Sequence, residues 1–146
     1  ADPNSLYSFP SHLQPLFDDS DLIRSPLSSL LLTLSASSRR LIVVHDHLMS
    51  FAGSEAASIP NAESYDFYSP SAAFLCEVEL MMMQQTGLDE LSSPDFMKFV
   101  ERRCKDVVPS CGLIINTCRE VEGEFLDFLS AREAYFGKPI FAVGPL

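Results

Sequence analysis

Three ionisable side chains follow one another at the end of a short apolar run. Residues 41–44 are all aliphatic, and His45, Asp46 and His47 come directly after them. A carboxylate at a strand end can hold an imidazole in one tautomer and stabilise the imidazolium that forms when the ring takes a proton. Asp46 is therefore a candidate for acid–base chemistry. A short acid in this position is equally suited to cap a following helix, so both interpretations stay open here.

The two histidines also raise the question of a metal site, which the sequence disfavours. No third ligand accompanies His45 and His47, and Cys104, Cys111 and Cys118 lack the close C-x₂₋₄-C pairing of structural zinc sites. Glycine-rich phosphate-binding loops and the G-x-S-x-G and H-E-x-x-H signatures are absent as well. We therefore expect this chain to bind no metal and no cofactor.

Alternating strands and helices are expected to position these side chains. Residues 11–34 have the apolar spacing of a helix, which Pro26 should kink or divide. The aliphatic run at 41–44 is typical of a strand that is buried on both faces. Ser71 is a suitable cap for the helix that follows it. The predicted strands span residues 41–44, 64–68, 112–116 and 139–143, and the later helices span 49–57, 72–85, 95–104 and 119–132.

The order of these elements predicts the fold class. Strands that are joined through helices favour right-handed crossovers, and hence an α/β fold with an open parallel sheet and helices on both faces. Ligands of such sheets bind at the carboxyl ends of the strands. Besides the cluster at residues 45–47, this edge should hold Tyr68, Ser69, Asn116 and Thr117. The last two are better explained as fixing a strand-to-helix turn than as touching a ligand.

Composition limits the classes of partner. Of the 146 residues, 47% are hydrophobic and 21% are charged, and the formal net charge is -10. This acidity disfavours nucleic acid and anionic membranes, because both require clustered Lys and Arg. The longest apolar runs fall far short of the roughly 20 residues that cross a bilayer. Four cysteines without a signal-like leader favour free thiols and a cytoplasmic location.

Four segments together resemble the plant UDP-glycosyltransferases of the two-domain GT-B type, and most of all the zeatin O-glucosyltransferase branch. The segments lie in the family's order and span nearly the whole chain. They are FPSHLQPLF at 9–17, LIVVHDHL at 41–48, GLIINTCREVEGEFL at 112–126 and FAVGPL at 141–146. The resemblance implies that the chain is the Rossmann-like amino-terminal half of a GT-B enzyme, in incomplete form.

The resemblance also implies a mechanism and site residues. In this family a histidine base deprotonates an acceptor hydroxyl, which attacks the anomeric carbon of a UDP-sugar with inversion, while an aspartate steadies the charged histidine. Asp46 matches that aspartate. The base belongs to a loop upstream of Ala1, so none of the three histidines of this chain takes its role. The acceptor face would be formed by His45, His47, Tyr68, Ser69, Ala73, Phe74 and Glu77.

The expected domain organisation follows from the same resemblance. Residues 1–146 would be a partial acceptor-binding domain, with an irregular lead-in at 1–10 and the start of an interdomain linker at 144–146. The absence of an initiator Met and of any Trp suggests that the upstream strands and the domain that holds the UDP-sugar lie outside the chain. The chain alone should then be inactive. The alternative is a truncated α/β domain without catalysis, which acts as a small-molecule binding or interaction module.

Overall fold

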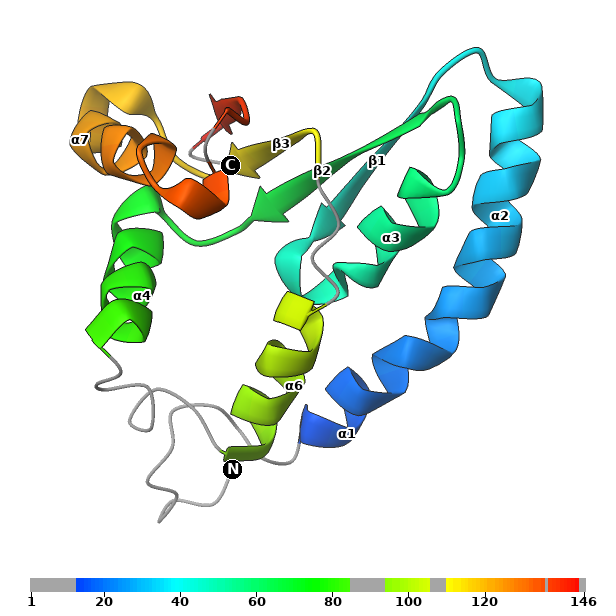
Figure 1. The fold of residues 1–146 in the computed structure, drawn as a ribbon, viewed down its shortest axis with the longest axis horizontal. Helices are drawn as coiled ribbons and strands as arrows, with labels where there is room; N and C mark the ends of the chain where they lie inside the picture. The colour runs from blue at the N-terminus through cyan, green and yellow to red at the C-terminus, as the bar shows by residue number, and fades with distance from the viewer. Residues whose placement is uncertain (1–12, 85–93, 106–109, 136, 145–146) are drawn as a thin grey trace.

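The computed structural model describes residues 13–84, 94–105, 110–135 and 137–144, which form a single sheet with helices packed on it (Figure 1). The predicted lead-in at 1–10 lies outside the described residues. The strands are β1 (Leu41–Asp46), β2 (Ala62–Tyr68), β3 (Gly112–Ile115) and β4 (Ile140–Ala142). The α-helices are α1 (Gln14–Asp18), α2 (Arg24–Ser37), α3 (Phe51–Ala57), α4 (Ala72–Gln84), α6 (Pro94–Lys105) and α7 (Arg119–Ser130), and the 3₁₀ turns are η2 (Asp19–Ile23), η3 (His47–Met49) and η4 (Glu133–Tyr135).

The four strands form one parallel sheet in the order β1-β2-β3-β4. Val43 pairs with Ser64, and Tyr68 at the carboxyl end of β2 pairs with Ile115 at the end of β3. Each pair of neighbouring strands is joined through a helix, as parallel pairing requires. The predicted α/β fold with an open parallel sheet is confirmed, and each predicted strand overlaps one of the strands of the structure.

The helices α3, α4 and α7 cover the same face of this sheet. A Cβ added to Gly53 in α3 would lie 2.8 Å from His45 and 3.4 Å from Ser64, while α4 and α7 share a core with Leu113 and Ile115. The strand residues that lie between these inward-pointing ones point to the opposite face of the sheet, because side chains on a strand alternate in direction. The sequence predicts helices on both faces of the sheet, whereas the described residues place helices on one face only.

The opposite face of the sheet is apolar and open within the described residues. The side chains of Ile42, Val44 and Phe141 are 52%, 54% and 44% exposed. The prediction that residues 41–44 are buried on both faces is therefore wrong for this chain. The aliphatic composition of β1 is typical of a two-sided strand, but no described helix packs on its second face, and β1 is also the edge of the sheet.

The core lies between the carboxyl half of the sheet and the two helices α4 and α7. Its buried members are Tyr68, Ala72, Cys76, Leu113, Ile115, Leu126 and Leu129. Burying one large aliphatic side chain stabilises a fold by about 1.5–3 kcal/mol, so this cluster anchors the strand ends whose side chains are candidates for function. The thiols of Cys76, Cys111 and Cys118 are free, as predicted.

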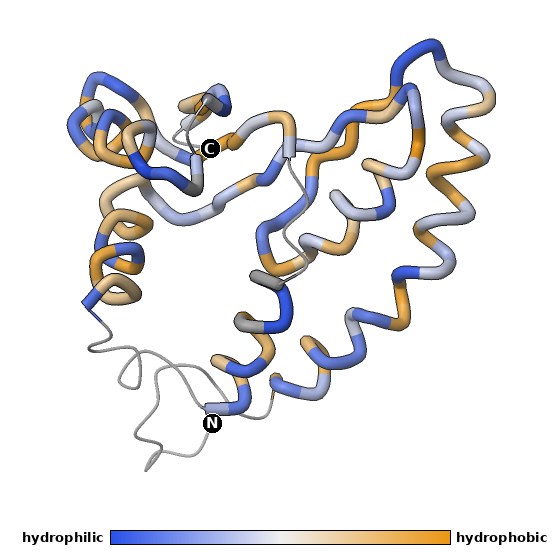
Figure 2. Tube along the Cα trace, in the orientation of Figure 1, coloured by the Kyte–Doolittle hydropathy of each residue, from blue (hydrophilic) through white to orange (hydrophobic). Residues whose placement is uncertain are grey.

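The first helical segment is divided, although not at the predicted position. The break is the 3₁₀ turn η2 at Asp19–Ile23, and Pro26 lies in the first turn of α2. Proline is tolerated there because the first helical N–H groups have no partner within the helix. Figure 2 shows hydrophobic residues at intervals along α2, and an unbroken hydrophobic run in β1 that gives way to hydrophilic residues at its carboxyl end. Within the described ranges, no helix is long and apolar enough to span a bilayer.

Candidate functional site at the carboxyl edge of the sheet

His47 and Tyr68 meet at the carboxyl ends of the two neighbouring strands β1 and β2. Tyr68 ends β2, and His47 is the first residue after β1. The Tyr68 hydroxyl lies 2.7 Å from Nδ1 of His47, and the two rings are stacked with centroids 4.7 Å apart and an interplanar angle of 27°. Tyr68 is buried, whereas His47 is partly exposed. Two of the predicted acceptor-binding residues thus form one unit.

Burial lowers the pKa of His47 below its ordinary value. The neighbouring His45 acts in the same direction, and Asp66, Asp46 and Glu79 oppose it. The imidazole is therefore neutral at pH 7, with one protonated and one unprotonated nitrogen. A neutral ring of this kind can donate one hydrogen bond and accept another.

Tyr135 and Glu79 add further polar contacts next to the pair of His47 and Tyr68. The Tyr135 hydroxyl donates to Oε1 of Glu79 at 3.1 Å, so η4 is tied to α4. Burial and the Glu79 carboxylate raise the pKa of Tyr135 well above its usual range. The phenol therefore stays protonated and acts as a donor that supports the elements around Tyr68.

His45 lies beneath the edge, between β1 and α3. It is only 8% exposed, and its Nδ1 is 3.1 Å from the Asp46 carbonyl oxygen and 3.2 Å from Oδ1 of Asp66. Its Nε2 is buried and has no hydrogen-bond partner among the described residues. Gly53 leaves room for the ring, because a Cβ there would lie 2.8 Å from Nε2. These contacts are those of a packed side chain, and the predicted acceptor contact of His45 stays a prediction.

Asp46 is exposed at the end of β1 and caps the following turn. Its Oδ1 accepts a hydrogen bond from the backbone N–H of Leu48 at 2.8 Å, which makes it the N-cap of η3. Its side chain points to the opposite side of the strand from His45, as strand alternation requires. The capping interpretation thus has a geometric basis. The catalytic interpretation remains a prediction, since its histidine partner is expected outside the chain.

The other predicted acceptor residues lie at and after the turn that follows β2. Ser69 is exposed, and its carbonyl oxygen accepts a hydrogen bond from Nδ2 of Asn116 at 3.2 Å. In the first turns of α4, Ala73 is partly exposed, whereas Phe74 and Glu77 are exposed. The backbone N–H of Phe74 donates to Oγ of Ser71 at 3.3 Å, so the predicted cap is present. These surfaces are accessible to a ligand.

Glu122 is a structural residue of the edge that the sequence pattern does not predict. Its Oε2 accepts from the backbone N–H of Ala72 at 3.0 Å and from the Thr117 hydroxyl. These hydrogen bonds lower its pKa, and its backbone leaves helical geometry with φ -120 and ψ 26. Glu122 thereby caps α4 from α7. Thr117 is held in this turn, in agreement with the structural role that the sequence favours for it.

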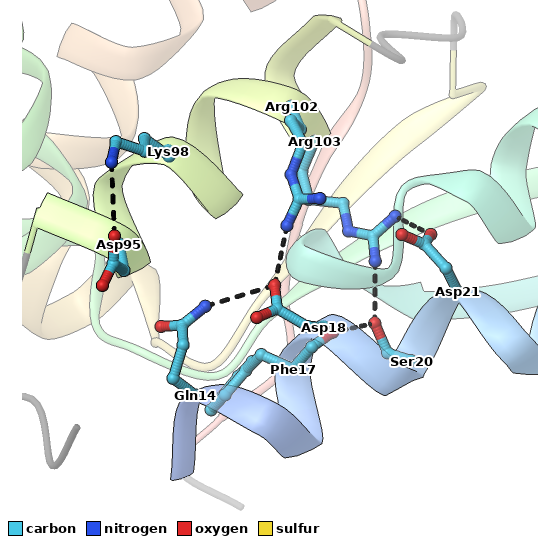
Figure 3. A network of polar contacts seen from close by, with 9 residues as sticks. All are labelled: Gln14, Phe17, Asp18, Ser20, Asp21, Asp95, Lys98, Arg102 and Arg103. Carbon is cyan, nitrogen blue, oxygen red and sulfur yellow. Dashed lines mark hydrogen bonds and ion pairs between the residues drawn. The ribbon is translucent and has the colours of Figure 1, made fainter. Parts of the chain in front are cut away.

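A second unpredicted residue, Arg103, lies on α6 next to η3. Its Nη1 donates to Oδ1 of Asp21 and its Nη2 to Oγ of Ser20, both at 2.7 Å (Figure 3). The guanidinium group also lies over the rings of Phe51 and Phe99, 5.1 and 4.7 Å from their centroids. Arg103 therefore joins α6, η2 and α3 into one packed unit beside the carboxyl end of β1. We call this unit of α6, η2 and α3 the wall beside η3.

Two further features do not form part of this site. An open groove of about 520 Å³ lies between α2 and α3, lined by Asp21, Arg24, Ser25, Ser28, Ser29 and Glu55, and includes none of the predicted site residues. Among the residues that the structure describes, no group of three or more His, Cys, Asp or Glu side chains could hold a metal ion.

The parallel sheet with helices packed on it defines an α/β domain, a class in which ligands bind at the carboxyl edge of the sheet. Comparison with known proteins identifies the family within this fold class. The family described as "Glycosyltransferase, N-terminal domain" matches residues 1–146. The chain therefore belongs to this family.

Curated relatives of this chain are named as zeatin glycosyltransferases. The chain is 37% identical to cis-zeatin O-glucosyltransferase 2 of Zea mays over 94% of its length, which is 32% of that protein. It is 32% identical to zeatin O-glucosyltransferase of Phaseolus lunatus and 30% identical to zeatin O-xylosyltransferase of Phaseolus vulgaris, in both cases over 98% of its length. The chain spans about a third of the length of these relatives.

Proposed function

We propose that this chain is the acceptor-binding part of a transferase that moves a sugar from a nucleotide sugar to the hydroxyl of a small molecule. The observation that carries the proposal is the family match over residues 1–146. The carboxyl edge of the sheet, where His47, Tyr68 and the start of α4 come together, is where a ligand of such a domain is expected. A zeatin-type cytokinin is the proposed acceptor, because the relatives are named for zeatin.

The proposed reaction is an inverting displacement. An acceptor hydroxyl loses its proton to a histidine that the rest of the protein supplies, and its oxygen attacks the anomeric carbon while the nucleoside diphosphate leaves. Asp46 would stabilise the imidazolium that forms, as carboxylates do in other acid–base pairs. The UDP-sugar would be held by the part of the protein beyond this chain. We further propose that the chain alone has no activity and that the complete protein is cytoplasmic.

The transferred sugar is proposed as glucose or a related sugar. Relatives of nearly equal similarity to this chain are named as glucosyl- and xylosyltransferases. Similarity in this part of the protein therefore does not separate the two sugars, as expected if the donor is recognised elsewhere.

A transfer assay tests the proposal. The full-length protein that contains this chain is incubated with trans-zeatin or cis-zeatin and with UDP-glucose or UDP-xylose, and products are measured by mass spectrometry. We expect a mass gain of one sugar, and none with the O-methyl ether of zeatin, which lacks the free hydroxyl. Failure of every donor and acceptor pair, with nucleotide and acceptor still bound, would favour the non-catalytic binding module instead.

A further inference from the structure

His47 uses one ring nitrogen inside the fold and leaves the other for a ligand. Nδ1 lies 2.7 Å from the Tyr68 hydroxyl, while Nε2 makes no hydrogen bond to any described residue. The two nitrogens flank Cε1 and their hydrogen-bonding directions diverge in the ring plane, so a ring held through Nδ1 directs Nε2 away from the Tyr68 hydroxyl. His47 is partly exposed at the carboxyl edge of β1, where ligands of parallel sheets bind.

Tyr68 fixes the orientation of this ring in two ways. Its hydroxyl restrains Nδ1, and its ring is stacked on the imidazole with a centroid separation of 4.7 Å. Tyr68 itself is 7% exposed and belongs to the core cluster with Ala72 and Ile115. A side chain buried to this extent offers little surface to an acceptor, but it is a rigid support for one that touches the acceptor.

We propose that Nε2 of His47 forms a hydrogen bond with a ring nitrogen of the acceptor, away from the reacting hydroxyl, and that Tyr68 is the positioning residue that holds the imidazole for this contact. The inference rests on the proposed function. The chemical class of acceptor is a small alcohol that carries a ring nitrogen away from the site of sugar transfer. An acceptor with the same hydroxylated side chain on a benzene ring lacks that partner.

The neutral charge of His47 suits this task. Because burial lowers its pKa, the ring stays uncharged at pH 7 and exchanges a neutral hydrogen bond with the ligand. A net hydrogen bond of this type changes affinity by about two- to tenfold. That is the size of effect expected for selection between two acceptors, and it is smaller than the effect of losing a catalytic group.

Two substitutions of His47 separate its nitrogens. In His47→Gln the terminal amide reaches the position of Nε2, whereas in His47→Asn it reaches only that of Nδ1. The full-length protein and both variants are assayed with trans-zeatin and with N-(4-hydroxy-3-methylbut-2-enyl)aniline, which has the side chain of zeatin without its purine nitrogens. The readout is the ratio of kcat/KM for the two acceptors at saturating UDP-sugar.

We expect His47→Asn to lower this ratio about five- to tenfold and His47→Gln to retain most of it, with the KM for the UDP-sugar unchanged in both. Tyr68→Phe should lower the ratio a few-fold through a higher KM for zeatin. Equal ratios in wild type, His47→Asn and His47→Gln would overturn the inference, provided that the melting temperatures show folded proteins. No sugar transfer by the wild type would instead overturn the proposed function, so the two failures are distinguishable.

Discussion

The position of Asp46 shows one role and permits a second. Its carboxylate accepts the N–H of Leu48, so it stabilises the turn η3 that carries His47. The same carboxylate is exposed at the carboxyl edge, where it can stabilise a positive charge on a histidine from elsewhere in the protein. A substitution that keeps the cap but removes the charge distinguishes these roles.

Asp46→Asn and Asp46→Ala should differ in stability but not in turnover. Asparagine is as good an N-cap as aspartate, whereas alanine loses about 1 kcal/mol. If Asp46 also steadies an imidazolium, both substitutions lower kcat by on the order of 10²-fold or more, and the KM for the UDP-sugar hardly changes. Melting temperatures and kcat of the full-length variants provide the measurement. Near-normal turnover in Asp46→Asn would leave Asp46 with the cap alone.

The lowered pKa of His47 predicts a loss of stability in mild acid. The unfolded chain takes up a proton on this residue near pH 6.5, while the folded chain resists it until a lower pH. Stability is therefore fully present above pH 6.5 and falls as the pH drops below it. Asp66, Asp46 and Glu79 reduce this effect, and His45 adds to it.

His47→Gln provides the control for that titration. The variant lacks the ionisable ring, so its melting temperature should fall less than that of the wild type between pH 7.5 and pH 5.5. Carboxylates contribute nearly equally to both proteins and cancel in the difference. Parallel curves of melting temperature against pH for the two proteins would contradict a lowered pKa of His47. An NMR titration of His47 with a midpoint above pH 6.5 would contradict it as well.

At the scale of secondary structure, Arg103 is the residue on which the wall beside η3 most depends. Its side chain is 4% exposed, and it contacts η2 and the rings of Phe51 and Phe99. Arg102, the next residue on α6, also pairs with a carboxylate, but Arg102 and Asp18 are 57% and 48% exposed. Exposed pairs contribute about 0–1 kcal/mol, whereas a buried arginine adds packing and ring contacts to its hydrogen bonds.

Arg103→Ala should therefore cost about 2–4 kcal/mol of stability, and Arg102→Ala less than about 1 kcal/mol. Chemical denaturation of the two variants beside the wild type measures the difference. Because the wall adjoins His47, Arg103→Ala should also raise the KM for the acceptor. Equal destabilisation by the two substitutions would show that the buried contacts of Arg103 contribute nothing beyond an exposed pair.

The elements themselves were largely predictable, and their partners in space were not. Hydrophobic periodicity and β-branched runs located the strands and helices, because these patterns are local. The sequence also placed Asp46, His47 and Tyr68 at one edge. It did not reveal Glu122 as the cap of α4, since that contact joins two helices, or Arg103 as a buried residue, since a basic residue on an amphipathic helix is usually exposed. An acid in the first turn of a predicted helix was the available signal for Glu122.

At the scale of the whole molecule, the second face of the sheet dominates the expected behaviour. Ile42, Val44 and Phe141 expose apolar surface on it, and β1 presents an unpaired edge in the described part of the chain. Such surfaces promote association between chains. We expect the isolated chain to bind a hydrophobic dye and to form soluble aggregates despite its net charge of -10.

The double substitution Ile42→Thr and Val44→Thr should reduce this association. Threonine keeps the β-branched shape that suits a strand, and it lowers the apolar area of the open face. Light scattering after size exclusion compares the variant with the wild-type chain. A monomeric wild-type chain with a cooperative thermal transition would show that the open face does not limit its independence.

We propose that this chain holds the acceptor and that the rest of the protein holds the nucleotide sugar. Hydrogen–deuterium exchange of the full-length protein, measured with zeatin alone and with UDP alone, tests it most directly. We expect zeatin to slow exchange in peptides that cover residues 46–49 and 69–77, and UDP to slow exchange only outside residues 1–146. Protection of these two segments by UDP and not by zeatin would contradict it.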